Sequence, residues 1–138
     1  MAEHFGINLV KGQNIKLTDL RKVIVGCGWD PDSSRSSSNF DLDLACAMLD
    51  SQRKMKSSDN FIYYGNRKST SDPIYHTGDN LTGEGEGDDE RLIIDLTRIP
   101  EWVETIAVVV CIYQAKQRKQ NFGLIQRSFI RLIDITNE

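Results

Sequence analysis

The sequence has 138 residues, the length of one ordinary domain and too short for two. Its composition, 39% hydrophobic and 27% charged, is that of a globular chain, and a net charge of −3 argues against a general nucleic-acid binder. No apolar run approaches the ~20 residues of a membrane-spanning helix, no secretory signal begins the sequence, and three widely spaced cysteines make no disulfide framework. We therefore expect a reduced, single-domain, cytoplasmic protein without a nucleic-acid partner.

Short strands separated by turn signals are predicted along the chain. Residues 7–9 and 15–17 could form an opening hairpin around Lys11 and Gly12. Residues 22–29 are rich in β-branched side chains, and residues 41–49 alternate between apolar and other positions, as expected for strands. Further strands are predicted at residues 61–64, 92–96, 105–113 and 129–135.

This pattern favours a mainly β fold, an antiparallel β-sandwich with one or two short helices. Residues 114–120 form the one run with helical character, and Pro100 starts a turn over residues 98–102. The three cysteines, Cys27, Cys46 and Cys111, fall within predicted strands, so we expect them to be small core residues.

The acidic residues gather in one predicted loop. Between Asp79 and Glu90, six of twelve residues are acidic and none is basic, although the rest of the chain has more basic than acidic residues. Carboxylates this close repel one another. The segment therefore either stays open in solvent or holds a cation.

Three groups of oxygen-bearing side chains could supply ligands to such a cation. They are Asp30 at the end of a predicted strand, the pair Asp41 and Asp43 on one face of the next strand, and the loop of residues 79–90. Calcium takes six to eight oxygen ligands, and the loop glycines would allow backbone carbonyls to contribute. The loop does not match an EF-hand, because Glu84 stands where that motif requires glycine.

Motifs throughout the chain resemble the TerD family, the tellurite-resistance and stress-response domain of bacteria. The resemblance rests on INLVKG at residues 7–12, VGCGWD at 25–30, FDLD at 40–43, HTGDNLTGEG at 76–85, GDDE at 87–90, QNFG at 120–123 and SFIR at 128–131. It implies a calcium-binding β-sandwich with some likeness to C2 domains. The metal ligands that it implies are drawn from Asp30, Asp41, Asp43, Asp79, Asn80, Gly83, Gly85, Asp88, Asp89 and Glu90.

The resemblance also carries expectations about extent and partners. Members of the family usually continue for several strands beyond the position of Asn137 and Glu138, so residues 1–138 are expected to form one TerD-like domain without those strands. A missing strand would expose a sheet edge, which invites dimerisation. Other tellurite-resistance or stress proteins are the expected partners, and association with the inner face of the membrane is a further expectation.

The function predicted from these residues is that of a non-enzymatic calcium-binding module, in which acidic loops organise a partner-binding surface. One alternative is a metal-dependent hydrolase that uses the same carboxylates, with His76 as the only nearby base. Another is a calcium-independent interaction domain with a solvated acidic loop. We expect His76 to hydrogen-bond the loop backbone rather than to act as a base, and Trp29 to pack in the core.

Overall fold

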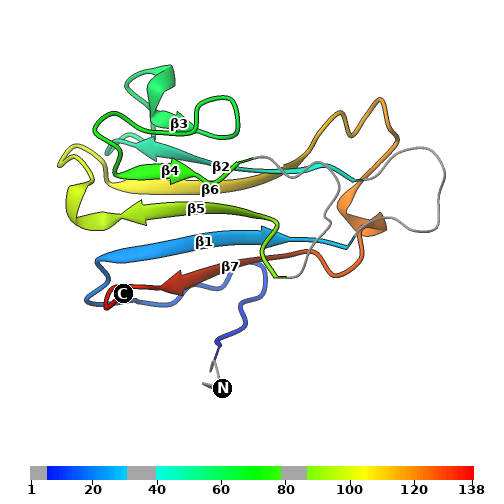
Figure 1. Cartoon of the computed structure of the whole chain (residues 1–138), viewed down its shortest axis with the longest axis horizontal. Coiled ribbons are helices and arrows are strands. Elements are labelled where there is room, and N and C mark those ends of the chain that lie inside the picture. Colours follow the sequence, from blue (N-terminus) through cyan, green and yellow to red (C-terminus); the bar gives the residue numbers. More distant parts are fainter. Residues whose placement is uncertain (1–5, 31–39, 79–86) are drawn as a thin grey trace.

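Seven strands form two antiparallel sheets in the computed structural model, which describes residues 6–30, 40–78 and 87–138 (Figure 1). The four-stranded sheet has the order β4 (Ile74–His76), β5 (Glu90–Asp95), β1 (Lys22–Gly28) and β7 (Phe129–Asp134). The three-stranded sheet has the order β3 (Phe61–Ile62), β2 (Leu42–Leu49) and β6 (Thr105–Ile112). The predicted β-sandwich is thus confirmed.

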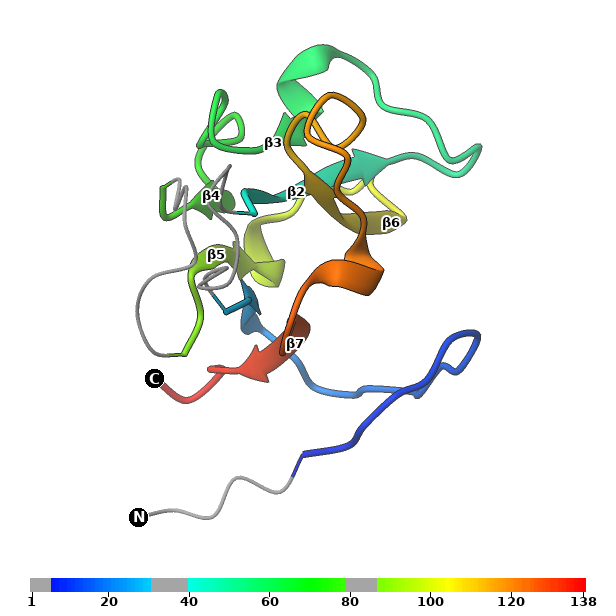
Figure 2. The same cartoon turned by 90° about the vertical axis from the view of Figure 1, so that its right-hand side faces the viewer.

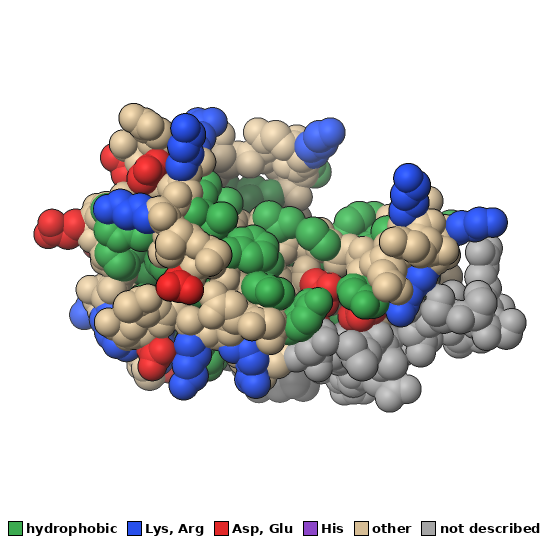
Figure 3. All heavy atoms as spheres, turned by 90° about the horizontal axis from the view of Figure 1, so that it is seen from above, with side chains coloured by type: hydrophobic (Ala, Val, Ile, Leu, Met, Phe, Trp, Pro, Cys, Tyr) green, Lys and Arg blue, Asp and Glu red, His purple; other side chains and the backbone are tan. Residues whose placement is uncertain are grey.

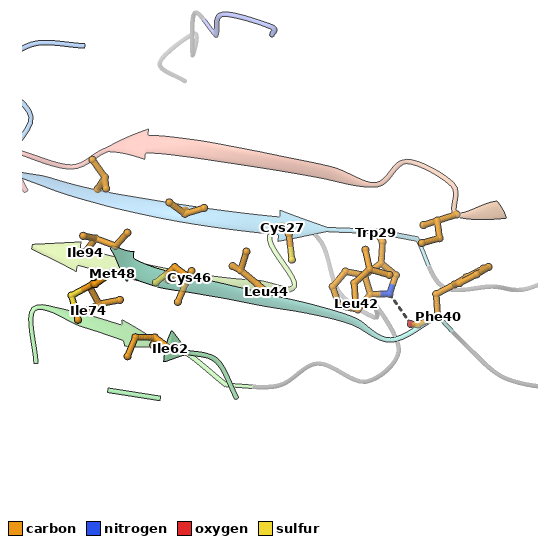
Figure 4. Packing of buried hydrophobic residues seen from close by; sticks show 14 residues of the cluster. Cys27, Trp29, Phe40, Leu42, Leu44, Cys46, Met48, Ile62, Ile74 and Ile94 are labelled. Carbon is orange, nitrogen blue, oxygen red and sulfur yellow. Dashed lines mark hydrogen bonds between the residues drawn. The ribbon is translucent and has the colours of Figure 1, made fainter. Parts of the chain in front are cut away.

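The core lies between the two sheets and follows from the alternation of apolar residues along the strands. In β2, Leu42, Leu44 and Cys46 are fully buried, and they face buried residues such as Cys27 of β1 and Ile94 of β5 (Figure 4). At one end of the core, Trp29 is buried as predicted. Its Nε1 donates a hydrogen bond of 3.0 Å to the carbonyl oxygen of Phe40. This bond ties the end of β1 to the chain that leads into β2.

The two sheets are closed on one side and open on the other. Strand β3 contacts β4 and β2 contacts β5, so the outermost strands β6 and β7 lie on the same side of the sandwich. Figure 2 shows the sheets separating from β3 and β4 toward β6 and β7. Ile130 and Leu132 of β7 are 52% and 50% exposed, although each lies opposite a buried β1 residue, Cys27 or Val25.

The predicted strands are confirmed at β1, β2, β3, β5, β6 and β7. The prediction missed β4, whose three residues are too few for a readable alternation. The opening hairpin was wrong. Gln13 donates to the carbonyl of Val10 in a turn, but residues 6–20 contain no strand, since a hairpin needs a surface to pack on and Ile7 and Leu9 are exposed.

The predicted helix at residues 114–120 was also wrong. Gln114 and Lys119 have φ values of 48° and 54°, which are incompatible with a right-handed helix, and the segment forms successive turns instead. The helices of the described residues are three short 3-10 turns, Ser58–Asn60, Leu96–Arg98 and Phe122–Leu124. Within the described ranges, no helix is long and apolar enough to cross a membrane.

Candidate metal centre

Three carboxylates converge at the end of the sandwich where β2 and β5 begin. One oxygen from each of Asp41, Asp43 and Glu90 lies within 4.8 Å of the others. Asp41 directly precedes β2 and Asp43 belongs to it, whereas Glu90 is the first residue of β5 in the other sheet. Asp41 and Glu90 are buried and Asp43 is half-buried. The group therefore joins the two layers of the fold.

Glu90 reaches this position because part of the β2 edge is left open. The short strand β3 pairs only with Cys46 and Ala47 of β2. Next to this pairing, the backbone N–H of Leu44 donates a hydrogen bond of 2.9 Å to Oε2 of Glu90. The carboxylate thus takes the place of a strand partner, which accounts for a fully buried glutamate at the start of β5.

His76 holds the same carboxylate oxygen from β4. The backbone N–H of Gly78 donates to Nδ1 of His76 at 3.0 Å, so the neutral ring carries its proton on Nε2. Nε2 lies 3.2 Å from Oε2 of Glu90 and donates to it. The ring is fully buried. His76 was expected to hydrogen-bond the loop backbone, and the bond that the structure shows is to the backbone of Gly78, directly before that loop.

The carboxylate group is electrostatically strained. Burial raises the pKa of Asp41 above its ordinary value, and the neighbouring Glu90 raises it further, while Arg118 opposes the rise. The buried Oδ1 of Asp41 accepts no hydrogen bond from any residue that the structure describes. A buried oxygen in this condition costs free energy, which a bound cation would recover. The donor set consists of carboxylate oxygens, which suits a hard cation such as calcium.

Asp88, another predicted ligand, lies elsewhere. Its side chain is buried between two arginines, with Oδ2 at 3.0 Å from Nε of Arg91 and Oδ1 at 2.7 Å from Nε of Arg131. Arg91 and Arg131 flank Gly26 on the neighbouring strands β5 and β7. The carboxylate thus lies above Gly26 and joins three strands of one sheet.

The remaining predicted ligands also have separate positions. Oδ2 of Asp89 accepts a hydrogen bond of 2.8 Å from the backbone N–H of Trp29, and burial raises the pKa of Asp89 despite this bond. Asp30 is paired with Arg127 at 2.7 Å. The other four, Asp79, Asn80, Gly83 and Gly85, lie outside the described residues. Of the predicted set, the structure brings together Asp41, Asp43 and Glu90.

Sequence reasoning missed how these carboxylates are held. The hydrogen bond from the N–H of Leu44 to Glu90 could not have been predicted, because a backbone donor leaves no signal in the sequence. Gly26 did leave a signal, since a glycine inside a strand often marks a close approach of another group. Cys27 and Cys46 are buried as predicted, but Cys111 is exposed, because it lies on the outer face of β6 opposite Asp43.

The fold and the carboxylate group define a class of protein, a two-layer β-sandwich with an acidic cluster joining its sheets at one end. The family model of the TerD domain matches residues 5–138 of the sequence, and the chain therefore belongs to the TerD family.

Relatives in the same family have names that refer to stress and tellurium. The chain is 44% identical over 145 residues to stress response protein SCP2 of Bacillus subtilis, a match that covers 95% of this chain and 72% of the relative. It is 41% identical over 136 residues to the tellurium resistance protein TerD of Serratia marcescens, covering 96% and 70%. General stress protein 16U of Bacillus subtilis is 40% identical over 137 residues, covering 96% and 71%.

Solved structures share the fold. The crystal structure of a protein of unknown function superposes with a TM-score of 0.70 at 25% identity, covering 85% of this chain and 67% of the other. A homologue of the telluride resistance protein TerD from Streptomyces coelicolor superposes with a TM-score of 0.68, covering 85% and 68%. At 19% identity, this second likeness is evidence of the fold alone.

Proposed function

We propose that the chain is a non-catalytic calcium-binding module of the tellurium-resistance and stress-response family, with Asp41, Asp43 and Glu90 as ligands. The observation that carries the proposal is the convergence of these three carboxylates within 4.8 Å. The buried Oδ1 of Asp41, to which no described residue donates a hydrogen bond, adds to it. Bound calcium supplies positive charge that cancels the repulsion between the carboxylates, so binding and folding stability are linked.

Calcium fits this donor set better than the other common cations do. Zinc sites in proteins usually include histidine nitrogen or cysteine sulfur among their ligands, whereas the three converging groups offer oxygen alone. Magnesium requires near-ideal octahedral geometry and keeps most of its water, while calcium accepts six to eight oxygens in flexible arrangements. Residues Asp79, Asn80, Gly83 and Gly85 stay candidates for further ligands under this proposal.

The environment of His76 favours a binding role over hydrolysis. A general base needs a nitrogen that can reach a substrate or a water molecule. In His76, Nδ1 accepts from the N–H of Gly78 and Nε2 contacts Glu90, and the ring is buried. Neither nitrogen is available for proton abstraction while these contacts persist.

The cellular part of the proposal follows the family. The module acts in the cytoplasm, and calcium fixes the acidic loops in the shape that other tellurite-resistance or stress proteins recognise. The segment after β6 carries Lys116, Arg118 and Lys119, which could also contact anionic lipid at the inner face of the membrane. Co-sedimentation with anionic vesicles, with and without calcium, measures this last part separately.

Thermal unfolding of the chelator-treated protein tests calcium binding directly. Calcium at a concentration well above its dissociation constant is expected to raise the midpoint by several degrees, and magnesium to raise it much less. Asp41→Asn and Asp43→Asn are expected to remove the calcium shift. The control is Asp59→Asn, which changes an exposed carboxylate away from the cluster. This variant is expected to keep the calcium shift. No calcium shift in the unmodified chain would overturn the proposal.

A further inference from the structure

The chain that follows β6 folds back on itself and brings an arginine over a tyrosine ring. Tyr113 directly follows β6, and residues 114–120 form successive turns. The backbone N–H of Arg118 donates to the carbonyl of Gln114 at 2.9 Å, and that of Gln120 donates to the next carbonyl, of Ala115, at 2.8 Å. The guanidinium of Arg118 consequently lies over the ring of Tyr113, with Cζ 5.2 Å from the ring centroid.

Tyr113 lies directly opposite a proposed metal ligand. The ladder between β2 and β6 includes the pair Leu42 and Ile112. Beyond this pair, the backbone N–H of Tyr113 donates a hydrogen bond of 2.8 Å to the carbonyl oxygen of Asp41. Residues opposite each other in an antiparallel pair have their side chains on the same face, with Cβ atoms about 4.5–5.5 Å apart. The ring that supports Arg118 is therefore a neighbour of the Asp41 side chain.

The charges that meet at this place are unequal. Asp41, Asp43 and Glu90 each carry a negative charge when ionised, and Arg118 carries one positive charge. The guanidinium acts on the carboxylates, because it opposes the rise in the pKa of Asp41 that burial and Glu90 cause. Arg118 is half-buried, which limits screening by salt. Figure 3 shows acidic, hydrophobic and basic side chains next to one another on the right of the view.

Arg118 differs in this respect from three other arginines, which are held by different carboxylates. They are Arg91 and Arg131, both on Asp88, and Arg127, on Asp30. Those pairs tie parts of the fold together, and their carboxylates lie outside the converging group. Arg118 instead approaches the carboxylates that are the proposed ligands, and its single charge offsets only part of theirs.

We propose that Arg118 is a counter-charge built into the chain, which stabilises the carboxylate group without metal and opposes the binding of calcium. The inference rests on the proposed function, since it concerns the affinity of the same site. A divalent cation that enters the group must come near the guanidinium, and like charges repel more strongly where solvent is partly excluded. Whether the guanidinium moves away or stays beside the bound ion, calcium binding costs more free energy than it would without Arg118.

Calcium titration of two charge variants tests the proposal. Arg118→Gln removes the counter-charge and is expected to tighten calcium binding by about three- to tenfold in calorimetry. The control is Lys56→Gln, which removes the same charge from another aromatic ring. Nζ of Lys56 lies 4.7 Å from the ring centroid of Trp102, which precedes β6, whereas Tyr113 follows it. This variant is expected to keep the affinity of the unmodified chain. Equal affinities in the two variants overturn the proposal.

Unfolding in the presence of a chelator separates this inference from the proposed function. Without metal, Arg118→Gln is expected to lower the thermal midpoint further than Lys56→Gln does, because the carboxylates have lost their counter-charge. Added calcium is expected to reduce this difference. Absence of calcium binding in the unmodified chain overturns the proposed function, and the inference with it. If the unmodified chain binds calcium but the two variants have equal midpoints in chelator, the inference alone is overturned.

Two further variants test the charge and its position. Arg118→Lys keeps a positive charge and is expected to bind calcium with nearly the affinity of the unmodified chain. Binding as tight as in Arg118→Gln would show that charge is not the cause, which overturns the proposal. Tyr113→Leu removes the ring that holds the guanidinium. In that background, Arg118→Gln is expected to tighten calcium binding less, and an undiminished effect overturns the positioning role of Tyr113.

Discussion

Gly26 provides the space that the carboxylate of Asp88 occupies. A Cβ atom built on Gly26 would lie 2.4 Å from Cγ of Asp88, a separation that real side chains do not show. The carboxylate lies there because Arg91 and Arg131 approach it from the strands on either side. This contact anchors the residues just before Glu90, and so it positions the start of β5 on which the carboxylate group depends.

Substitution of Gly26 by alanine is therefore expected to destabilise the protein. The methyl group would displace the buried Asp88 and loosen its ion pairs with Arg91 and Arg131, at a cost of about 1–3 kcal/mol. Urea unfolding measures this cost. Gly6→Ala is the control, because no atom lies within 4 Å of the added Cβ at that position. Equal stability of the two variants would contradict the role assigned to Gly26.

A strand's buried face could be predicted where apolar and other side chains alternate along the strand itself. Where the prediction was wrong, the reason is physical. Alternation along β2 placed Leu42 and Leu44 in the core, because large apolar side chains on one face of that strand alternate with aspartate and alanine on the other. In β6, both faces are apolar, so the sequence pattern does not show which face of the strand points into the core. For this reason Cys111 was wrongly assigned to the core.

The candidate site could be predicted only in part for a related reason. Sequence reasoning included Asp41, Asp43 and Glu90 but could not separate them from Asp88. Asp88 differs from these three carboxylates because it forms ion pairs with Arg91 and Arg131, and Arg131 is distant from it in sequence. Which carboxylates are neutralised by the chain itself, and which are left to a cation, is a property of tertiary structure.

His76 is expected to support the carboxylate group without being a metal ligand. His76→Phe removes the donor to Oε2 of Glu90 and the acceptor for the N–H of Gly78, which is expected to cost about 1–3 kcal/mol of stability. It is also expected to weaken calcium binding, because Glu90 loses its orientation. Calorimetric titration with calcium and urea unfolding measure the two effects. Tyr75→Phe, at the exposed neighbouring position of β4, is the control and should change neither.

The three cysteines are expected to differ in reactivity. Cys111 is exposed, whereas Cys27 and Cys46 are fully buried, and burial raises the pKa of each buried thiol to about 12. Because the thiolate is the reactive form, iodoacetamide should modify Cys111 alone in the native protein at pH 8. Mass spectrometry after brief labelling counts the modified sites. Modification of Cys46 without unfolding would contradict the described core.

The raised thiol pKa of Cys46 also predicts how stability changes at high pH. The folded protein keeps the proton of Cys46 up to about pH 12, whereas the unfolded chain releases it near the ordinary value of 9.0. The folded state therefore binds more protons in this window, and the free energy of unfolding falls as pH rises from about 9 toward 12. Urea unfolding at several pH values in this range measures the slope.

Cys46→Ala, although less stable overall, is expected to show a shallower slope than the unmodified chain. Cys111→Ala removes an exposed thiol instead and should leave the slope unchanged. Equal slopes in all three proteins would show that the Cys46 thiol does not contribute.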